Sequence, residues 1–368
     1  MKKVGIITFH NSRSYGACLQ AIATVYMIRN MGYQAEVIDY VNLFEQKRYK
    51  ADLDNLIVAM KYIRWKIKTW LSRDEYWLQR AFGNTKQLYS DAISSEHYTK
   101  IEELSNLKYD VLLVGSDQVW NSQITEKLDT VFLLDFGQSP KRISYASSMG
   151  SHRIEPNEEK LFRHCLKRFS FISVREKFAM EELRRILDID VEIVLDPTLL
   201  LTKEQWTDYI LQVSERIPVP QEPYILTFFV GKNISFYREQ VFQIKEKKQL
   251  PVYNIQTNKR KYIPVDRVLA GVTCGEFVQW IQNAAYIITD SFHGTAFSLL
   301  YQKQFTSISN TVNPIRVKEL LESVGLQERL DSPQNCDREI EYHAVNKKLN
   351  ELRSRSIKWL QTALESIQ

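Results

Sequence analysis

The stretch VGIITFHNSRSYGACLQAIATVYMIRNMGYQAEVIDY, residues 4–40, holds the alternation that decides the fold. Residues 4–9 are apolar and rich in β-branched side chains on both faces, which predicts a buried strand. Residues 16–32 carry apolar side chains at helical spacing and end at Gly32, which predicts a helix. Residues 35–40 predict a second strand. A strand, a helix and a strand in this order indicate a parallel sheet with a right-handed crossover.

The same alternation continues along the chain, with one interruption at residues 214–223. This segment, SERIPVPQEP, contains three prolines and several charges, which is typical of a linker. We therefore expect an α/β protein of two doubly wound Rossmann-like domains, residues 1–205 and 206–368, with a helical insertion at about residues 45–100 in the first. Further strands are expected at residues 109–116, 142–149, 171–174, 192–196, 224–230, 251–256, 286–291 and 304–308, with helices such as 177–187 and 275–284 between them.

The C-terminal helix and the strand ends set the expected position of a ligand. An apolar stripe on that helix predicts that it packs back across both domains; its residues are Val345, Leu349, Leu352, Trp359 and Ala363. Ligands of open parallel sheets bind beyond the carboxyl ends of the strands. Two such domains facing a cleft would place the loops of residues 10–16 and 115–121 opposite a turn at residues 289–294.

Composition and charge exclude several classes of protein. The 368 residues are 44% hydrophobic and 25% charged, which is typical of a globular protein. The formal charge of +5 is too small to suggest a nucleic-acid partner, although it favours anionic substrates. The apolar run at the start is too short for a signal peptide, and no stretch is long enough to cross a bilayer, so we expect a cytoplasmic protein.

The cysteines and histidines suggest no metal and no disulfide framework. Four scattered cysteines, three of them among apolar neighbours, predict buried thiols in a reducing compartment. Most of the histidines are isolated, without partners at metal-ligand spacing. The chain also has no phosphate-binding Walker loop and no GxGxxG fingerprint. We therefore expect no metal and no bound cofactor.

Residues 56–73, LIVAMKYIRWKIKTWLSR, form a basic amphipathic pattern with two interpretations. The first is an inserted helix whose apolar stripe packs on the first domain while its charges are solvated. The second is a helix that lies on an anionic membrane surface at the inner face of the membrane. The second interpretation predicts association with anionic vesicles.

The turn TDSFHG, residues 289–294, joins an apolar strand to a helix. The first N–H groups of such a helix lack intrahelical partners and, with the helix dipole, attract phosphate or carboxylate. Ser291 and Thr295 offer hydroxyl donors, and Gly294 would let a ligand approach the backbone closely. The alternative is purely structural: Asp290 or Ser291 caps the helix, and His293 is an ordinary first-turn residue.

Five stretches resemble the polysaccharide pyruvyl transferase family, over nearly the whole domain pair from Val4 to about Leu326. They are residues 9–23, 109–121, 173–179, 194–200 and 290–305, the last reading DSFHGTAFSLLYQKQF. The resemblance implies a fold similar to GT-B glycosyltransferases. It also implies transfer of the enolpyruvyl carbons of phosphoenolpyruvate to a sugar, typically as a cyclic ketal on two hydroxyls with release of phosphate. Some bacterial members act on sugars destined for capsule or cell-wall polymers.

The resemblance also implies roles for single residues on the donor side. His293 matches the histidine of the C-terminal motif at the phosphoenolpyruvate site, and Arg175 matches an arginine that helps to hold the anionic donor. Where some members have an arginine two residues before the histidine, this chain has Ser291, so another cation is needed; the candidates are Arg316, Lys318 and Lys303. Arg175 suits carboxylate or phosphate because its planar fork binds them bidentately. The alternative is a surface arginine paired with Glu176 or Glu181.

The loop GSDQVWN, residues 115–121, offers a set of side chains suited to a sugar. Short polar groups bind sugar hydroxyls, and an aromatic ring suits the C–H face of the sugar; the set is Ser116, Gln118, Trp120 and Asn121. We expect Asp117 to orient the acceptor or to act as general base, with a helix N-cap as the alternative. Ser12 and Tyr15 in the first loop are further acceptor-binding candidates. His10 is more typical of a structural histidine.

These observations lead to one expected function and two alternatives. The expected enzyme moves the pyruvyl group of phosphoenolpyruvate, as co-substrate, onto saccharide hydroxyls in surface or capsular polysaccharide biosynthesis. The acceptor sugar, free or carried on a lipid, is left open. The first alternative is a GT-B-type glycosyltransferase that uses a nucleotide sugar. The second is a non-catalytic saccharide-binding protein of the same fold.

Overall fold

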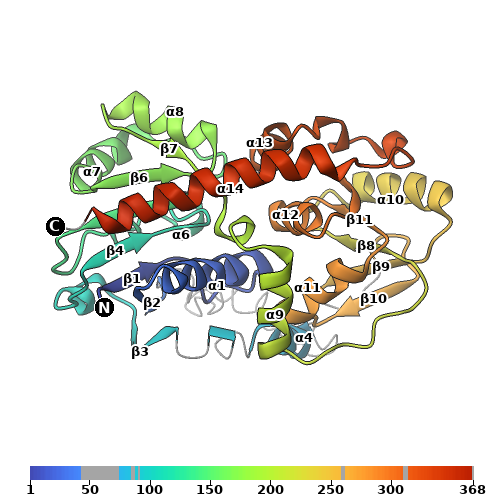
Figure 1. The fold of residues 1–368 in the computed structure, drawn as a ribbon, viewed down its shortest axis with the longest axis horizontal. Coiled ribbons are helices and arrows are strands. Elements are labelled where there is room, and N and C mark those ends of the chain that lie inside the picture. The colour runs from blue at the N-terminus through green and yellow to red at the C-terminus, as the bar shows by residue number, and fades with distance from the viewer. Residues whose placement is uncertain (43–73, 84–87, 90–91, 258–261, 310–313, 367–368) are drawn as a thin grey trace, which may run out of the picture. The chain divides into compact units, whose positions relative to one another are not determined.

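The computed structural model describes residues 1–42, 74–83, 88–89, 92–257, 262–309 and 314–366. The chain divides into two compact units, each built on one parallel sheet (Figure 1). The first contains Met1–Tyr62, Tyr89–Leu200 and Glu351–Gln368, and the second contains Ile63–Leu88 and Leu201–Asn350. The basic segment at residues 56–73 and most of the predicted insertion lie outside the described residues.

The first unit contains a parallel sheet with the strand order β3-β2-β1-β4-β5-β6-β7 in the described residues. Its strands are β1 (Lys3–Ile7), β2 (Gln34–Tyr40), β3 (Ile93–Tyr98), β4 (Val111–Val114), β5 (Arg142–Ser147), β6 (Phe171–Val174) and β7 (Glu192–Ile193). Its helices are α1 (Tyr15–Asn30), η1 (Ile101–Leu104), α6 (Ser122–Thr125), η2 (Thr130–Leu133), α7 (Pro156–Leu166), α8 (Lys177–Ile186) and η3 (Pro197–Leu199). The central strands are buried on both faces, as the apolar runs predicted.

The second unit contains a parallel sheet with the order β10-β9-β8-β11-β12 among the residues described. Its strands are β8 (Ile225–Phe228), β9 (Val252–Gln256), β10 (Arg267–Ala270), β11 (Tyr286–Thr289) and β12 (Gln304–Ser307). Its helices are α4 (Asp74–Phe82), α9 (Lys203–Val213), α10 (Ile234–Lys248), α11 (Cys274–Asn283), α12 (Phe292–Leu300), α13 (Pro314–Val324), η4 (Gln327–Arg329) and η5 (Pro333–Asn335). Helix α14 (Tyr342–Glu365) begins in this unit and ends in the first.

Local signals explain why the helices begin and end where they do. Helix α1 follows Ser14, whose backbone is extended, and its chain turns at Gly32, which has a φ of +86°. Helix α11 starts with a capping box, in which Thr273 Oγ1 accepts from the Glu276 N–H and the Glu276 carboxylate accepts from the Thr273 N–H. These signals sit at the predicted boundaries, so the α/β alternation read from the sequence is confirmed.

Two edge strands had no clear sequence signal, and one helix of the insertion expected in the first domain lies in the second unit. Strand β3, ISSEHY, is polar and lies at the edge of its sheet, where a strand needs no apolar face. Strand β10 is also an edge strand, with only four residues. Helix α4 precedes β3 in the chain, yet it belongs to the second unit, where Arg80 binds both carboxylate oxygens of Glu276 at 2.8 and 2.7 Å.

The C-terminal half of α14 is held on the first unit by polar and aromatic contacts. Ser356 Oγ accepts from the Leu195 N–H at 2.9 Å, and Lys141 Nζ donates to Ser366 Oγ at 2.6 Å. Trp359 lies against the rings of Tyr145 and Phe171. Residues from Glu351 onward therefore cluster with the first unit, although they were expected within a domain of residues 206–368.

The structure also gives the state of the cysteines and the hydropathy of the helices. All four cysteines are buried, and none forms a disulfide. In the described part of the chain, no helix combines the length and the apolar character that a membrane-spanning segment needs.

A buried glutamate in the first unit, Glu158, predicts that the stability of the protein depends on pH. Glu158 Oε2 contacts His152 Nε2 at 2.9 Å and accepts from the Glu155 N–H at 3.0 Å. Burial opposes ionisation, but these groups and Ser122 hold the pKa of Glu158 below its ordinary value of 4.5. A carboxyl with a lowered pKa in the folded state stabilises the fold above its unfolded pKa, and this contribution is lost as the pH falls through the folded pKa.

We expect the free energy of unfolding to fall on acidification below about pH 5, and to fall less steeply in Glu158→Gln. Urea unfolding at a series of pH values measures this slope. Glu181→Gln, which removes an exposed carboxylate paired with Lys177, is the matched control and should keep the wild-type slope. A Glu158→Gln slope equal to that of the wild type would contradict the prediction.

Candidate functional site

Each sheet has one topological switch point, where ligands of doubly wound folds bind. In the first unit, β1 pairs with β2 on one side and β4 on the other, so the loops that follow β1 and β4 flank the switch point. In the second unit, β8 lies between β9 and β11, so the loops that follow β8 and β11 flank the switch point of this sheet. The predicted motifs at residues 10–16, 115–121 and 289–294 therefore all lie at the carboxyl ends of their strands.

The turn after β11 forms a capped start of α12. Ser291 has extended backbone angles, and its Oγ accepts from the Gly294 N–H at 3.3 Å. The Ser291 N–H in turn donates to Thr289 Oγ1 at 3.1 Å. The structural interpretation of Ser291 as an N-cap is therefore confirmed, while its contact with a donor stays a prediction. The first turn of α12 directs its amide groups and the positive end of the dipole toward the carboxyl edge of the sheet.

Close packing explains two other residues of this motif. A Cβ on Gly294 would lie 2.4 Å from Thr289 Oγ1, so glycine is required by the contact between strand and helix. Thr295 is completely buried, and its hydroxyl is bonded to Ser291 O and Ser307 Oγ. The prediction that Thr295 contacts a donor directly is contradicted, because the hydroxyl is enclosed between α12 and β12.

His293 occupies the first turn of α12 at the switch point of the second unit. Its side chain is largely buried, with 7% exposure, and its ring packs edge-on against Phe292. The guanidinium of Arg316, on the first turn of α13, lies 5.9 Å from the centre of the Phe292 ring. The end of α12 that carries His293 therefore has a cation beside it.

The other two candidate cations are placed differently. Lys303 lies past the C-terminal end of α12 and just before β12, at the opposite edge of the sheet from His293. The prediction that Lys303 replaces the family arginine near His293 is therefore wrong. Lys318 is exposed on α13 and pairs with Glu322 at 3.8 Å. Arg316 is the candidate that the fold brings to the α12 turn.

Asp290 connects the two loops at this switch point, a role that the sequence did not assign. Its carboxylate accepts from the Val230 N–H at 2.7 Å, the Gly231 N–H at 2.8 Å and the Tyr237 hydroxyl at 2.7 Å. Burial raises the pKa of Asp290, and the three donors offset part of this effect. The β8 loop, residues 229–231, is thus tied to the residue before the α12 cap.

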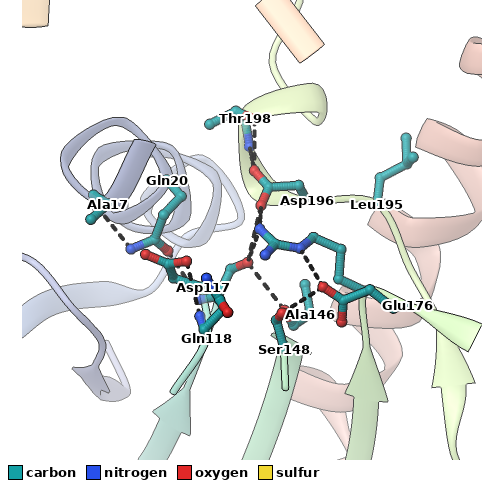
Figure 2. Close-up of polar contacts among 12 residues, drawn as sticks. Ala17, Gln20, Asp117, Gln118, Ala146, Ser148, Glu176, Leu195, Asp196 and Thr198 are labelled. Atoms are coloured by element: carbon teal, nitrogen blue, oxygen red, sulfur yellow. Dashed lines mark hydrogen bonds and ion pairs between the residues drawn. The ribbon is translucent and has the colours of Figure 1, made fainter. Parts of the chain in front are cut away.

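In the first unit, Arg175 directly follows β6 and lies in a buried ion-pair network with Glu176 and Asp196, both labelled in Figure 2. Its guanidinium pairs with Asp196 and contacts Glu176 Oε1 at 3.3 Å. Burial acts to lower the pKa of Arg175, but the surrounding carboxylates, including that of Asp117, raise it above its ordinary value. Arg175 is therefore no surface residue, and its partners are Asp196 and Glu176 rather than Glu181, which pairs with Lys177.

Hydroxyl and amide groups from neighbouring strand ends complete this network. Ser116 Oγ lies 3.1 Å from both Asp196 Oδ2 and Ala146 O, either of which can accept its one proton, and the Ser116 N–H donates to Gln20 Oε1 at 3.0 Å. Ser148 Oγ donates to Glu176 Oε1 at 2.5 Å (Figure 2). The network thus fixes the loops after β4, β5 and β6 at one edge of the sheet. Ser116 is fully buried in it, which contradicts its expected contact with an acceptor.

Asp117 and Gln118 are the partly exposed members of the loop at residues 115–121. Asp117 has a φ of +63°, and its Oδ1 accepts from the Gln118 N–H at 2.9 Å. The helix that follows is capped by Asn121 instead, so the N-cap interpretation of Asp117 is wrong. A carboxylate held at the switch point of the first sheet fits the predicted role of orienting a hydroxyl group, which stays a prediction.

The predicted sugar platform at Trp120 is wrong. The side chain is 0% exposed, its ring packs edge-on against Phe162, and its Nε1 donates to Phe132 O at 2.9 Å. Trp120 therefore belongs to the hydrophobic core. Asn121 is also largely buried, and its Oδ1 accepts from the Gln123 N–H as the α6 cap. Its expected contact with an acceptor stays a prediction.

The two candidates in the loop after β1 differ in exposure, although the Oγ atom of Ser12 is itself buried. Ser12 is partly exposed, whereas the Tyr15 side chain is buried at the start of α1. His10 is buried, with Nε2 2.9 Å from Asp39 Oδ1 and Nδ1 3.2 Å from Thr8 O. The structural interpretation of His10 agrees with these contacts. Among the described residues, no three His, Cys, Asp or Glu side chains gather in an arrangement that could bind a metal ion.

Comparison with solved structures supports the architecture. The S. aureus MnaA–UDP structure shares 13% identity with a TM-score of 0.50, covering 98% of this chain and 91% of that one. The UDP-GlcNAc 2-epimerase of Methanocaldococcus jannaschii shares 13% identity, a TM-score of 0.49 and coverage of 95% and 91%. E. coli heptosyltransferase WaaC with ADP shares 12% identity, a TM-score of 0.40 and coverage of 95% and 99%. The likeness to the S. aureus protein shows the fold alone, which is of the GT-B type.

Comparison of the sequence with protein families gives the identity of the chain. No curated protein shows a significant match. The family model described as polysaccharide pyruvyl transferase matches residues 15–311. That span includes the loop after β4, the switch point of the second unit, the ion pairs of Arg175 and the α12 turn with His293. The chain therefore belongs to the polysaccharide pyruvyl transferase family.

Proposed function

We propose that the chain transfers the pyruvyl group of phosphoenolpyruvate to two hydroxyls of a saccharide. In this reaction two sugar oxygens become bonded to C2 of the donor, and C3 takes up a proton to become a methyl group. The bond from C2 to the phosphate oxygen breaks, and phosphate leaves with the second sugar proton. The family match over residues 15–311 is the observation that carries the proposal.

The second unit offers the chemistry that the donor needs. Phosphoenolpyruvate carries a carboxylate and a phosphate, which favour cations and oriented N–H donors. The α12 turn has the positive end of a helix dipole, with Arg316 beside the Phe292 ring. His293 would either protonate C3 or, as an imidazolium, stabilise the departing phosphate. No bound cofactor is required, since the donor itself supplies the reactive enol.

The first unit offers the acceptor side of the proposal. Asp117 at the β4 end would orient a sugar hydroxyl or take its proton, and the neighbouring Gln118 and Ser12 are polar and partly exposed. We assign the acceptor to the precursors of a surface or capsular polysaccharide, free or carried on a lipid, handled in the cytoplasm or at the inner face of the membrane. The basic segment at residues 56–73 is the proposed membrane contact.

Two measurements test the proposed reaction against its alternatives. Phosphate release is followed with phosphoenolpyruvate and a panel of glycans, and the products are analysed by mass spectrometry for a pyruvyl ketal. Thermal stabilisation by UDP or ADP but not by phosphoenolpyruvate, together with sugar transfer from a nucleotide sugar, would favour the glycosyltransferase. Saccharide binding without product across the panel would favour the non-catalytic alternative.

Arg316→Ala is expected to raise the KM for phosphoenolpyruvate about 10-fold or more, because a charge-assisted contact to an anion contributes about 1.5–3 kcal/mol. The kcat should change less. Lys318→Ala is the matched control, since it removes an exposed cation on the same helix that pairs with Glu322. Equal KM values for both variants and the wild type would remove Arg316 from the donor site.

A further inference from the structure

The β8 loop of the second unit is an anion-binding arrangement that the protein fills with its own side chain. Consecutive N–H groups from Val230 and Gly231 point at the two oxygens of Asp290, and the Tyr237 hydroxyl donates to the same carboxylate. Asp290 is 2% exposed, so these donors face a carboxylate that is largely removed from solvent. Val230 itself is more than half exposed, so the loop reaches the surface while its amide groups are turned inward.

This arrangement occupies the place where doubly wound folds hold a phosphate. In such folds, N–H groups of the loop after the first strand bind an anion at the switch point. Strand β8 is the first strand of the second sheet, and β11 lies beside it across the switch point. The carboxylate of Asp290 at this position occupies the N–H donors of Val230 and Gly231, and its negative charge repels a second anion.

The same carboxylate determines where the α12 turn lies. Asp290 stands between Thr289, which ends β11, and Ser291, which caps α12. Its bonds to the β8 loop, and to Tyr237 on α10, hold this residue from the side away from β12. His293 follows within the first turn, so a displacement of residue 290 would be passed on to the imidazole through a rigid, capped helix.

We propose that Asp290 is an internal anion with two roles: it positions the α12 turn that carries His293, and it excludes nucleotide diphosphates from the β8 loop. The first role rests on the proposed function, whereas the second concerns binding alone. Together they would direct a small anionic donor to the α12 turn and Arg316, rather than to the loop that holds phosphate in other doubly wound proteins.

Chemical rescue tests the internal anion without any assay of activity. Asp290→Ala should have a lower melting temperature than the wild type, and formate or acetate should restore part of the loss by occupying the vacated position between the donors. Asp266→Ala is the matched control: Asp266 also accepts a backbone N–H, from Val252 at 2.8 Å, but its side chain is 46% exposed. The control and the wild type should not respond to formate. An Asp290→Ala melting temperature that is unchanged, or that formate does not raise, would overturn the proposal.

Exclusion of diphosphates is measured with pyrophosphate and UDP as probes. Asp290→Ala should bind pyrophosphate at least about 10-fold more tightly than the wild type, because two N–H donors become available and a negative charge is lost. Tighter binding should also be seen for UDP by isothermal titration calorimetry. Equal or weaker binding of both probes by the variant would remove the second role.

The positioning role is tested by turnover of phosphoenolpyruvate. Asp290→Asn keeps the size of the side chain but turns an amide group toward the donors. This variant tests the positioning role if the alanine variant fails to fold. We expect kcat to fall about 10-fold or more while the KM changes less, and formate to raise the kcat of Asp290→Ala at a temperature where the variant is folded. Wild-type kcat in Asp290→Asn would refute the positioning role.

The outcomes separate this inference from the proposed function. A wild-type protein that never releases phosphate from phosphoenolpyruvate refutes the proposed reaction and with it the positioning role. In that case formate rescue and pyrophosphate binding still decide whether Asp290 is an internal anion. Conversely, active wild-type protein with no formate rescue refutes the inference alone.

Discussion

Arg175→Met is expected to destabilise the protein by about 3–5 kcal/mol, the largest stability effect that the described residues predict. The substitution leaves the carboxylates of Asp196 and Glu176 buried without the cation that compensates them. Loss of pyruvyl transfer in this variant would then follow from loss of the fold, before any role in binding the donor is considered. Urea unfolding measures the stability directly.

A surface pair supplies the control for this experiment. Arg168→Met removes an arginine that contacts Asp135 at 2.5 Å, but both side chains are at least 30% exposed, so we expect a loss of no more than about 1 kcal/mol. The double variant Arg175→Met with Asp196→Asn should be less destabilised than the sum of the single changes, because one buried charge is removed with its partner. If Arg175→Met were as stable as Arg168→Met and only the KM for phosphoenolpyruvate rose, the guanidinium would belong to the donor site instead.

His293→Asn is expected to lower the kcat for pyruvyl transfer by about 100- to 10,000-fold, the range over which a positioned acid or base accelerates a reaction. The imidazole lies in the first turn of α12 beside Phe292, and asparagine keeps a polar group there at a smaller size. The melting temperature should change only slightly, which separates this effect from that of Arg175→Met. Phosphate release under saturating donor is the measurement.

His343→Asn is the matched histidine control, since His343 is exposed on α14 and lies outside the proposed site. Its kcat should equal that of the wild type. Undiminished turnover by the asparagine variant would exclude His293 from the chemistry.

The sequence predicted the two parallel sheets and the motifs at the ends of their strands because apolar strands and capped helices leave strong local signals. The turn at residues 289–294 is an example: a buried strand, a capping serine and a helix follow one another within a few residues. Residues 115–121 were placed correctly at the end of β4 for the same reason. Edge strands such as β3 were missed, since an edge strand has no apolar pattern to reveal it.

The direction of side chains was less predictable than the position of the backbone. Trp120 follows a strand end, where an aromatic ring suits a sugar as well as a core, and only its contact with Phe162 decides between them. Asp290 appears in the sequence only as one of two alternative helix caps, because its partners, Val230 and Tyr237, lie more than 50 residues away in the chain. The carboxylate that neutralises Arg175 most directly, Asp196, is 21 residues away. Long-range contacts of this kind leave no local signal.

Because α4 belongs to the second unit, the exchange of whole units between related proteins is constrained. Arg80 on this helix binds Glu276 and Gly271 O, and the Tyr209 hydroxyl donates to Leu88 O, so a piece from the first quarter of the chain is built into the second unit. A hybrid spliced at residues 214–223 would take α4 from one parent and α11 from the other. Exchange of the two units between relatives would therefore succeed only when residues 74–88 are taken from the same parent as the second unit.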